Sequence, residues 1–174
     1  KLEWEIEIIG NWKIMSIKVL VLEGGFNEEH EISLKTGEEV KKSLKNLKIN
    51  FESLIVDPKT FEHEIDKYNQ EYICFNALHG TFGEDGKIQK ILDNKNFKYT
   101  HSNAKSSYIC FNKKLTKDIV NNLNLATPDY ITLEVEKINK NKLKDIFLTF
   151  GPFVIKPILS GSSFGIKIFK NENE

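Results

Sequence analysis

Apolar runs alternate with amphipathic stretches through the first hundred residues of the chain. The apolar runs have the length of strands and lie at 17–22, 51–56, 72–75 and 97–100. After the first run, apolar residues at near-helical spacing predict a helix to about residue 48, with an inward face of Ile32, Val40, Leu44 and Leu47. Near-continuous apolar runs are typical of strands buried on both faces, so the pattern predicts an α/β fold with a Rossmann-like parallel sheet.

The second half of the chain gives shorter patterns. Helices are predicted at 113–125 and 138–150, a strand at 130–133, and a hairpin at 153–168. The apolar residues of the two helices are expected to face the protein interior: Leu115, Ile119, Leu123, Leu143, Ile146, Phe147 and Phe150. We expect this half to be packed more loosely than the first.

The predicted hairpin carries the most informative chemistry. Lys156 lies at its first apolar run, and the loop 161–165 that follows is made mostly of Gly and Ser. A buried lysine is costly unless an anion neutralises it, and glycines let several backbone N–H groups approach the same anion. The pattern favours a phosphate-binding hairpin. The alternative is a surface hairpin whose Lys156 extends to water.

Composition narrows the class of protein. The chain is 40% hydrophobic and 29% charged, which allows a sizeable core, and its formal net charge of zero argues against a nucleic-acid binder held by a basic field. Every basic residue is Lys, so lysines and backbone amides must bind any anion. No run is long enough to span a membrane. Cys74 and Cys110 lie in apolar segments and are interpreted as two buried thiols of a cytosolic protein.

Three groups of polar residues are candidates for a site. Glu29 follows a glycine pair and lies with other acids at a helix start, where capping is the alternative role. His79 lies in a glycine-rich loop after the third strand, where open α/β sheets bind ligands, although it could simply hydrogen-bond the loop. Asp85 is expected to cap the next helix. Lys113 and Lys117 are one helical turn apart, and a solvated basic face is the alternative there.

These motifs occur in a fixed order that resembles the D-alanine–D-alanine ligase family from about residue 15 to the last residue. The resemblance rests on several groups of residues, at 24–25, 29–33, 76–80, 83–86, 99–102, Lys113 with Lys117, 156–157 and 161–165. It implies an ATP-grasp enzyme. The implied domains are an N-terminal domain at 15–102 and the truncated first part of an ATP-grasp domain at 103–174, an incomplete α+β unit.

The resemblance also implies roles for individual residues. Lys113 and Lys156 contact the ATP phosphates, and the mobile loop with Gly161, Ser162, Ser163 and Gly165 closes over them. Glu29 anchors the ammonium of the first D-alanine, Ser162 orients substrate and catalytic groups, and His79 lies close to that substrate. The implied cofactors are ATP and Mg²⁺, with the metal ligands expected beyond residue 174 and none within the chain. The implied protein is a cytoplasmic homodimer at full length that binds D-alanine and ATP, with no nucleic acid or membrane.

The sequence departs from the family pattern at three positions. Asn27 stands where Ser is usual, Glu23 where a small or apolar residue is common, and Phe164 where Val is usual. None of these changes removes a charge that the mechanism needs. Because the family's metal ligands lie beyond residue 174, we expect this chain alone to have no useful ligase activity.

Alternatives remain open. They are another ATP-grasp carboxylate–amine ligase, a ligase that forms D-alanyl–D-lactate, and a catalytically incomplete remnant without the metal-binding half. Residues 1–14 are expected to be extraneous to the fold, with an alternating strand-like pattern. Residues 1–10 weakly resemble the C-terminal end of the flavin-dependent enolpyruvoylglucosamine reductase of cell-wall synthesis.

Overall fold

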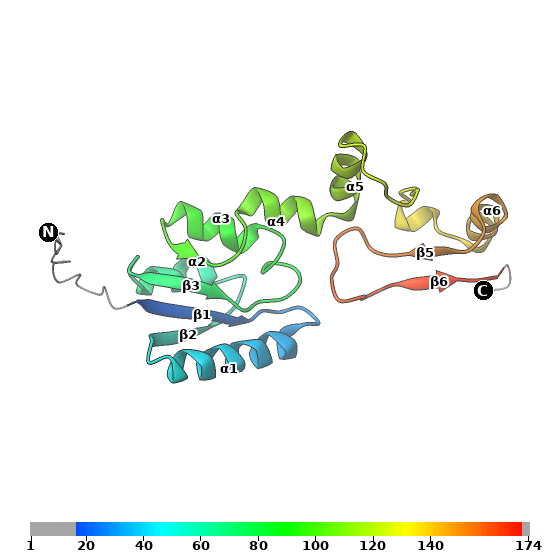
Figure 1. The fold of residues 1–174 in the computed structure, drawn as a ribbon. Coiled ribbons are helices and arrows are strands. Elements are labelled where there is room, and N and C mark those ends of the chain that lie inside the picture. Colours follow the sequence, from blue (N-terminus) through cyan, green and yellow to red (C-terminus); the bar gives the residue numbers. More distant parts are fainter. Residues whose placement is uncertain (1–16, 172–174) are drawn as a thin grey trace, which may run out of the picture.

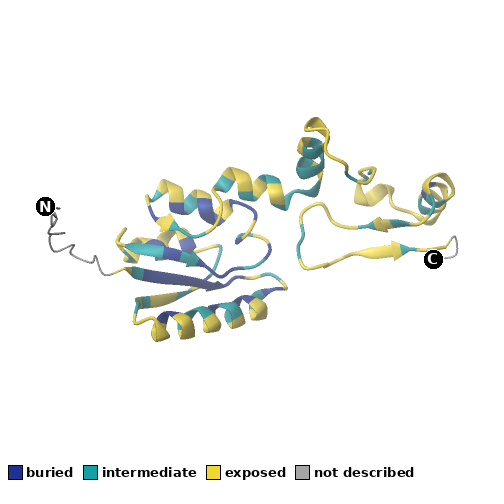
Figure 2. Cartoon of the chain, viewed as in Figure 1, coloured by how far each residue is buried: buried dark blue, intermediate teal, exposed yellow. Residues whose placement is uncertain are grey.

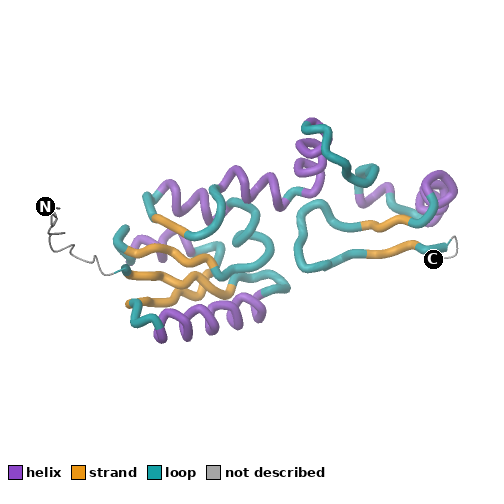
Figure 3. Tube along the Cα trace, in the orientation of Figure 1, coloured by secondary structure: helices purple, strands orange, loops and turns teal. Residues whose placement is uncertain are grey.

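A parallel four-stranded sheet dominates the structure, a computed structural model that describes residues 17–171 (Figures 1 and 3). The strands are β1 (Lys18–Gly24), β2 (Asn50–Val56), β3 (Tyr72–Asn76) and β4 (Lys98–Tyr99). Their order in space is β2-β1-β3-β4, so β1 is a central strand with a parallel neighbour on each side. The predicted parallel α/β sheet is confirmed, and all four strands lie where the apolar runs predict them.

The two faces of β1 bury alternate residues because side chains in a strand alternate with period two. Leu20 and Leu22 face one cluster, which includes Phe61 of α2 (Phe61–Glu64) and Ile65 of the short helix η1 (Ile65–Lys67). The same cluster includes Ile88 and Leu92 of α3 (Lys87–Asn94). Val19 and Val21 face the other cluster with Leu44 of α1 (His30–Asn46). Helices therefore cover both faces of the sheet, as Figure 1 shows.

The rest of the described chain is less packed. It contains α4 (Ala104–Phe111), α5 (Lys113–Asn122), η2 (Val135–Lys137), α6 (Lys140–Phe150) and the antiparallel strands β5 (Phe153–Ile155) and β6 (Lys167–Phe169). Ile146 is the one buried hydrophobic side chain found after residue 102 in the described range. Figure 2 shows the same contrast, with buried residues concentrated around the four-stranded sheet. The predicted hairpin and the predicted looser packing are both confirmed.

Several local predictions are wrong. Residues 130–133 have strand-forming side chains but pair with no strand in the described chain, and a β-strand needs a pairing partner. Helix α4 was not predicted, although Asn103 caps it by accepting a hydrogen bond from the Ser106 amide (2.9 Å). Ile32 and Leu47 are exposed because α1 covers β1 and β2 but leaves part of β3 open.

Other predictions are corrected in detail. Of the residues predicted to face inward on α5 and α6, Ile146 is buried, whereas Leu123 and Phe150 are about 60% exposed. Asp85 does not occupy the N-cap position of α3, which is Gly86, but its carboxylate accepts a hydrogen bond from the Lys87 amide (3.1 Å). Cys74 is buried as predicted, while Cys110 is exposed. The predictions for residues 1–14 lie outside the described residues. Among the helices of residues 17–171, none is long and apolar enough to cross a bilayer.

A buried acid under α1 explains an unusual helical glycine. Glu23 of β1 is 1% exposed and accepts a hydrogen bond from Lys41 Nζ at 2.5 Å, while its Oε2 has no partner among the described residues. Gly37 faces this carboxylate, and a Cβ there would lie 1.9 Å from Glu23 Oε2. The acid that departs from the family pattern therefore fits because α1 has no side chain at that point.

We expect Gly37→Ala to destabilise the chain by about 1–3 kcal/mol, although glycine to alanine normally stabilises a helix, because the new methyl group overlaps the buried carboxylate. Urea unfolding measures the difference. The same change made in a Glu23→Ala background should cost much less. An equal loss in both backgrounds would show that Glu23 is not the cause.

Candidate functional site

Two loops meet at the carboxyl edge of the parallel sheet, one after β1 and one after β3. Ser33 of α1 links the first residues of the two loops. Its hydroxyl accepts a hydrogen bond from the Gly24 amide (2.8 Å) and donates one to the Ala77 carbonyl (2.9 Å). Both loops therefore start from fixed positions. This is the edge at which parallel α/β sheets bind ligands.

Asn27 connects the tips of the two loops. Its side-chain amide donates to the carbonyl oxygens of His79 (2.7 Å) and Thr81 (3.1 Å), and its Oδ1 accepts from the Glu29 amide (2.9 Å). A serine hydroxyl is one donor and could not make this set of bonds in the same way. Asn27, noted in the sequence only as a departure, is thus a structural link beside the candidate residues.

Glu29 is the most buried acid of the site, with 4% of its surface exposed. It occupies the N-cap position of α1 but makes no side-chain capping bond, so the capping alternative does not describe it. The helix N-terminus still favours its negative charge. Its Oε1 accepts a hydrogen bond from the hydroxyl of Ser162, which lies 133 positions later in the chain.

The loop between β5 and β6 reaches Glu29 through this bond. A Cβ at Gly161 would lie 3.4 Å from Glu29 Oε2 and 3.6 Å from Glu84 Oε2, so two carboxylates approach the loop at this glycine. Ser162 and Ser163 both have positive φ angles, 45° and 61°, and Gly165 follows at 69°. The structure therefore brings Glu29 and the small-residue loop together.

The His79 ring has a polar neighbour beside each of its nitrogens. Its Nε2 lies 2.8 Å from Thr36 Oγ1, and its Nδ1 lies 3.7 Å from Glu84 Oε1. The ring is partly exposed and lies in the loop that Asn27 holds. Glu29 and His79 are therefore in adjoining loops, while Thr36 and Glu84 were not identified as site residues from the sequence.

Lys113 and Lys156 approach each other beside the loop. Lys113 Nζ donates to the Ser160 carbonyl at 2.5 Å, and the Lys113 amide donates to the Ile158 carbonyl at 3.2 Å. Burial lowers the pKa of the Lys113 ammonium, and the nearby charge of Lys156 lowers that pKa further. Two cations held this close favour an anion between them.

The prediction that Lys156 lies in a buried strand is wrong. Strand β5 ends at Ile155, and Lys156 is exposed, because nothing in the described chain covers the outer faces of the hairpin.

Lys117 is not part of a solvated basic face. Its Nζ donates to Thr127 Oγ1 (2.7 Å) and to the Pro128 carbonyl (2.6 Å), and lies 5.2 Å from the centre of the Tyr130 ring. Lys117 therefore holds the segment after α5.

The Cys74 thiol does not contribute to the site. Cys74 lies in the core, and burial raises the pKa of its thiol to about 12, so the nucleophilic thiolate does not form at neutral pH. Across residues 17–171, no group of three or more His, Cys, Asp or Glu side chains is arranged to hold a metal ion.

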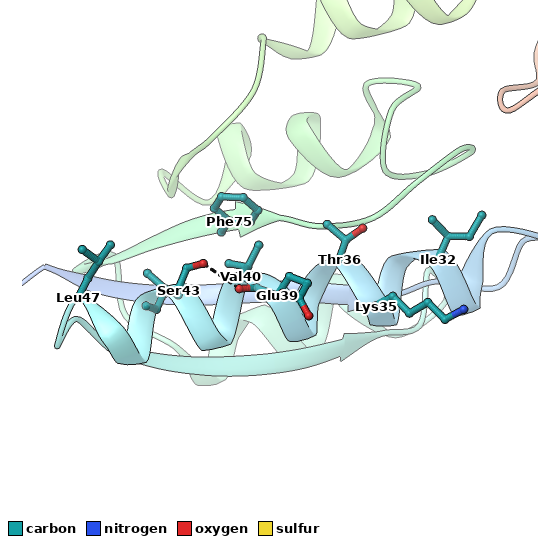
Figure 4. A pocket seen from close by; sticks show the side chains of 9 residues that line it. Ile32, Lys35, Thr36, Glu39, Val40, Ser43, Leu47 and Phe75 are labelled. Atoms are coloured by element: carbon teal, nitrogen blue, oxygen red, sulfur yellow. Dashed lines mark hydrogen bonds between the residues drawn. The ribbon is translucent and has the colours of Figure 1, made fainter.

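An apolar groove lies elsewhere, between α1 and β3. Its volume is about 730 Å³, and its lining is mostly apolar (Figure 4). The residues that line it are Ile32, Lys35, Thr36, Glu39, Val40, Ser43, Leu44, Leu47 and Phe75. None of the residues predicted for the site is among them, and only Thr36 connects the groove to the site.

The chain is similar to known D-alanine–D-alanine ligases. No family model matches the chain. The D-alanine–D-alanine ligase of Pelagibacter ubique is 41% identical over 162 residues, which cover 91% of this chain and 52% of the relative. That of Wolbachia from Drosophila simulans is 40% identical over 161 residues, covering 92% and 49%. The chain spans about half the length of the curated relatives it matches.

Solved structures give the same family. The D-alanine–D-alanine ligase of Bacillus anthracis superposes with a TM-score of 0.74 at 32% identity, covering 90% of this chain and 50% of that one. Its ATP complex gives 0.72 at 30% identity, covering 90% and 52%. The ligase of Coxiella burnetii gives 0.70 at 25% identity, covering 90% and 57%.

We expect Asn27→Asp to destabilise the chain by about 1–3 kcal/mol, because a carboxylate would face the His79 and Thr81 carbonyls that now accept hydrogen bonds. Unfolding in urea measures the loss. Asn69→Asp is the matched control, because Asn69 uses only its Oδ1, as acceptor for the Glu71 amide at 3.1 Å. Equal effects of the two substitutions would contradict the role given to Asn27.

Proposed function

The chain is homologous over most of its length to about half of a D-alanine–D-alanine ligase, and we propose that it forms the part of such an enzyme that binds the first D-alanine and grips the phosphates of ATP. The observation that carries the proposal is the contact between Ser162 and Glu29. It joins the small-residue loop to a buried acid at the mouth of the sheet, in a chain about 40% identical to named ligases.

Glu29 is the proposed anchor for the ammonium group of the first D-alanine. A buried carboxylate needs a cation or several hydrogen-bond donors, and the described neighbours of Glu29 supply the single hydroxyl of Ser162. An ammonium group offers three donors and a full positive charge. The Ser162 hydroxyl then holds the carboxylate in position, and His79 lies in the adjoining loop near the substrate.

Lys113 and Lys156 are proposed to bind ATP phosphates. Burial lowers the pKa of Lys113 and the charge of Lys156 lowers it further, and a phosphate beside both ammonium groups would offset both effects. Gly161, Ser162, Ser163 and Gly165 form the loop proposed to close over the terminal phosphates and exclude water. A solved neighbour, the ligase of Bacillus anthracis, is described as complexed with ATP.

The described residues do not fit a Mg²⁺ site. Glu29 and Glu84 approach Gly161, but Glu29 already accepts from Ser162 and Glu84 lies against His79. No third carboxylate joins them within residues 17–171. The metal that the family resemblance implies therefore needs ligands from outside the described chain, and no step is assigned to it here.

The proposed reaction has two steps. The carboxylate of the first D-alanine attacks the terminal phosphorus of ATP, and ADP leaves as D-alanyl phosphate forms. The amine of the second D-alanine attacks the acyl carbon, and the tetrahedral intermediate expels phosphate while the amine loses a proton. Within this chain, Glu29 positions the first substrate and the lysines neutralise charge on the phosphates.

We also propose a division of the chain into a substrate-binding domain at 15–102 and part of an ATP-grasp domain at 103–174. The buried core up to Phe97 and the open packing after residue 102 support this division. By the family resemblance, the whole protein is proposed to be a cytoplasmic homodimer that takes part in cell-wall precursor synthesis.

A second candidate is another ATP-grasp carboxylate–amine ligase. It would share the loop and the lysines but would not need a buried anchor for the ammonium of an amino acid. The burial of Glu29 favours D-alanine over a substrate without an amino group.

We expect Glu29→Gln to weaken D-alanine binding at least about tenfold, because the amide removes the charge that pairs with the ammonium group. Isothermal titration of D-alanine into the chain, with L-alanine as the stereochemical control, measures the change. Glu28→Gln is the matched control, because Glu28 is exposed beside Glu29. Unchanged affinity for Glu29→Gln would remove Glu29 from the substrate site.

The 174-residue chain alone is expected to release no D-alanine-dependent ADP above background, because its described residues hold no metal cluster and it spans about half of the relatives. A coupled ADP assay with ATP, Mg²⁺ and D-alanine tests this, with the Pelagibacter ubique relative as the positive control. Turnover by the isolated chain at the rate of that relative would contradict the expectation.

A further inference from the structure

Thr36 directs its hydroxyl away from its own helix. Helical Ser and Thr commonly donate to the carbonyl four residues earlier, as Ser43 does to Glu39 (3.0 Å) and Thr149 does to Asp145 (2.8 Å). Figure 4 shows the Ser43 bond, and shows Thr36 on the side of α1 that faces Phe75 of β3. Within residues 17–171, the hydroxyl of Thr36 has one partner, His79 Nε2 at 2.8 Å.

This bond and the charge of Glu84 together favour one tautomer of the His79 ring. Nδ1 faces Glu84 Oε1 at 3.7 Å, and an ionised carboxylate only accepts hydrogen bonds, so the proton of the neutral ring belongs on Nδ1. Nε2 then carries the lone pair and accepts from the Thr36 hydroxyl. In this tautomer Nε2 is hydrogen-bonded, and the Nδ1 proton lies on the side of a negative charge. The opposite tautomer would leave the Thr36 proton without an acceptor and place a lone pair toward the Glu84 carboxylate.

The connection continues to the small-residue loop. Glu84 Oε2 would lie 3.6 Å from a Cβ at Gly161, and the next residue, Ser162, donates to Glu29. Thr36, His79 and Glu84 therefore form a line of polar groups from the middle of α1 to the loop. Its far end lies beside the proposed substrate anchor.

We propose that Thr36 is a positioning residue, whose hydroxyl holds His79 with Nδ1–H toward Glu84 and so orients both side chains at the first-substrate site. The effect on substrate rests on the proposed function, while the hydrogen bond to His79 does not. Thr36 touches no reacting atom in this arrangement. It acts through His79.

The tautomer of His79 can be measured directly without substrate. In the ¹⁵N-labelled full chain, long-range proton–nitrogen spectra at neutral pH report the tautomer of each of the four histidines. We expect wild-type His79 to carry its proton on Nδ1. Thr36→Val, which has nearly the same shape, should move His79 toward the other tautomer, while Thr36→Ser should keep the wild-type signals.

Two controls separate positioning from a general loss of structure. Signals of His30, His63 and His101 should be unchanged in Thr36→Val, because a misfolded chain would alter them as well. Thr149→Val removes a hydroxyl that bonds only within its own helix, and should leave His79 unchanged. A His79 signal that is the same in wild type and Thr36→Val overturns the proposal.

The second measurement is D-alanine binding by titration. We expect Thr36→Val to bind D-alanine about three- to tenfold more weakly, the effect of one neutral hydrogen bond, and Thr36→Ser to bind as wild type does. If Thr36→Val changes the tautomer of His79 but binds D-alanine with wild-type affinity, Thr36 does not contribute to substrate binding. Absence of D-alanine binding by the wild-type chain would instead count against the proposed function, and the tautomer of His79 would still report whether Thr36 positions the ring.

Discussion

A buried carboxylate at the carboxyl edge of a parallel sheet is the interaction on which the site depends. Glu29 is almost fully enclosed, so its charge must be balanced by the helix N-terminus and by donors that reach it from elsewhere in the chain. The donor in the described chain is Ser162, which belongs to the loop between β5 and β6. The same contact that satisfies the acid therefore brings the two halves of the chain into one site.

Close approach of the loops makes this burial possible. Asn27 ties the loop after β1 to the loop after β3, and Gly80 passes directly against the acid, where a Cβ would lie 2.5 Å from Glu29 Oε2. Gly80 also has a positive φ of 69°, which glycine adopts without strain. A larger residue at this position would force the second loop away and expose Glu29 to water. The glycine in the His79–Gly80 pair is thus explained by the acid in the other loop.

The sequence predicted the sheet well because burial on both faces leaves a continuous apolar run. The family resemblance named Glu29 and Ser162, and the structure places these two side chains in contact. The sequence did not predict Thr36 or Glu84, because their roles come from contacts with His79 that no local pattern encodes. The strand predicted at 130–133 failed for a related reason. Strand propensity describes a segment, whereas a strand exists only when a second segment pairs with it.

The open packing of the second half bears on how the loop can work. The described hairpin has two three-residue strands, Phe153 stacks on Phe169 across it, and the loop is held at its start by Lys113 and at its tip by Glu29. An element with so little buried surface has a low free-energy cost of local opening. In the proposed function, the bond from Ser162 has to open while substrate enters and form again once the loop has closed, and a single hydroxyl–carboxylate bond meets that condition. In the proposed function, a phosphate would favour closure, because burial and the Lys156 charge both disfavour the Lys113 ammonium when no anion is present.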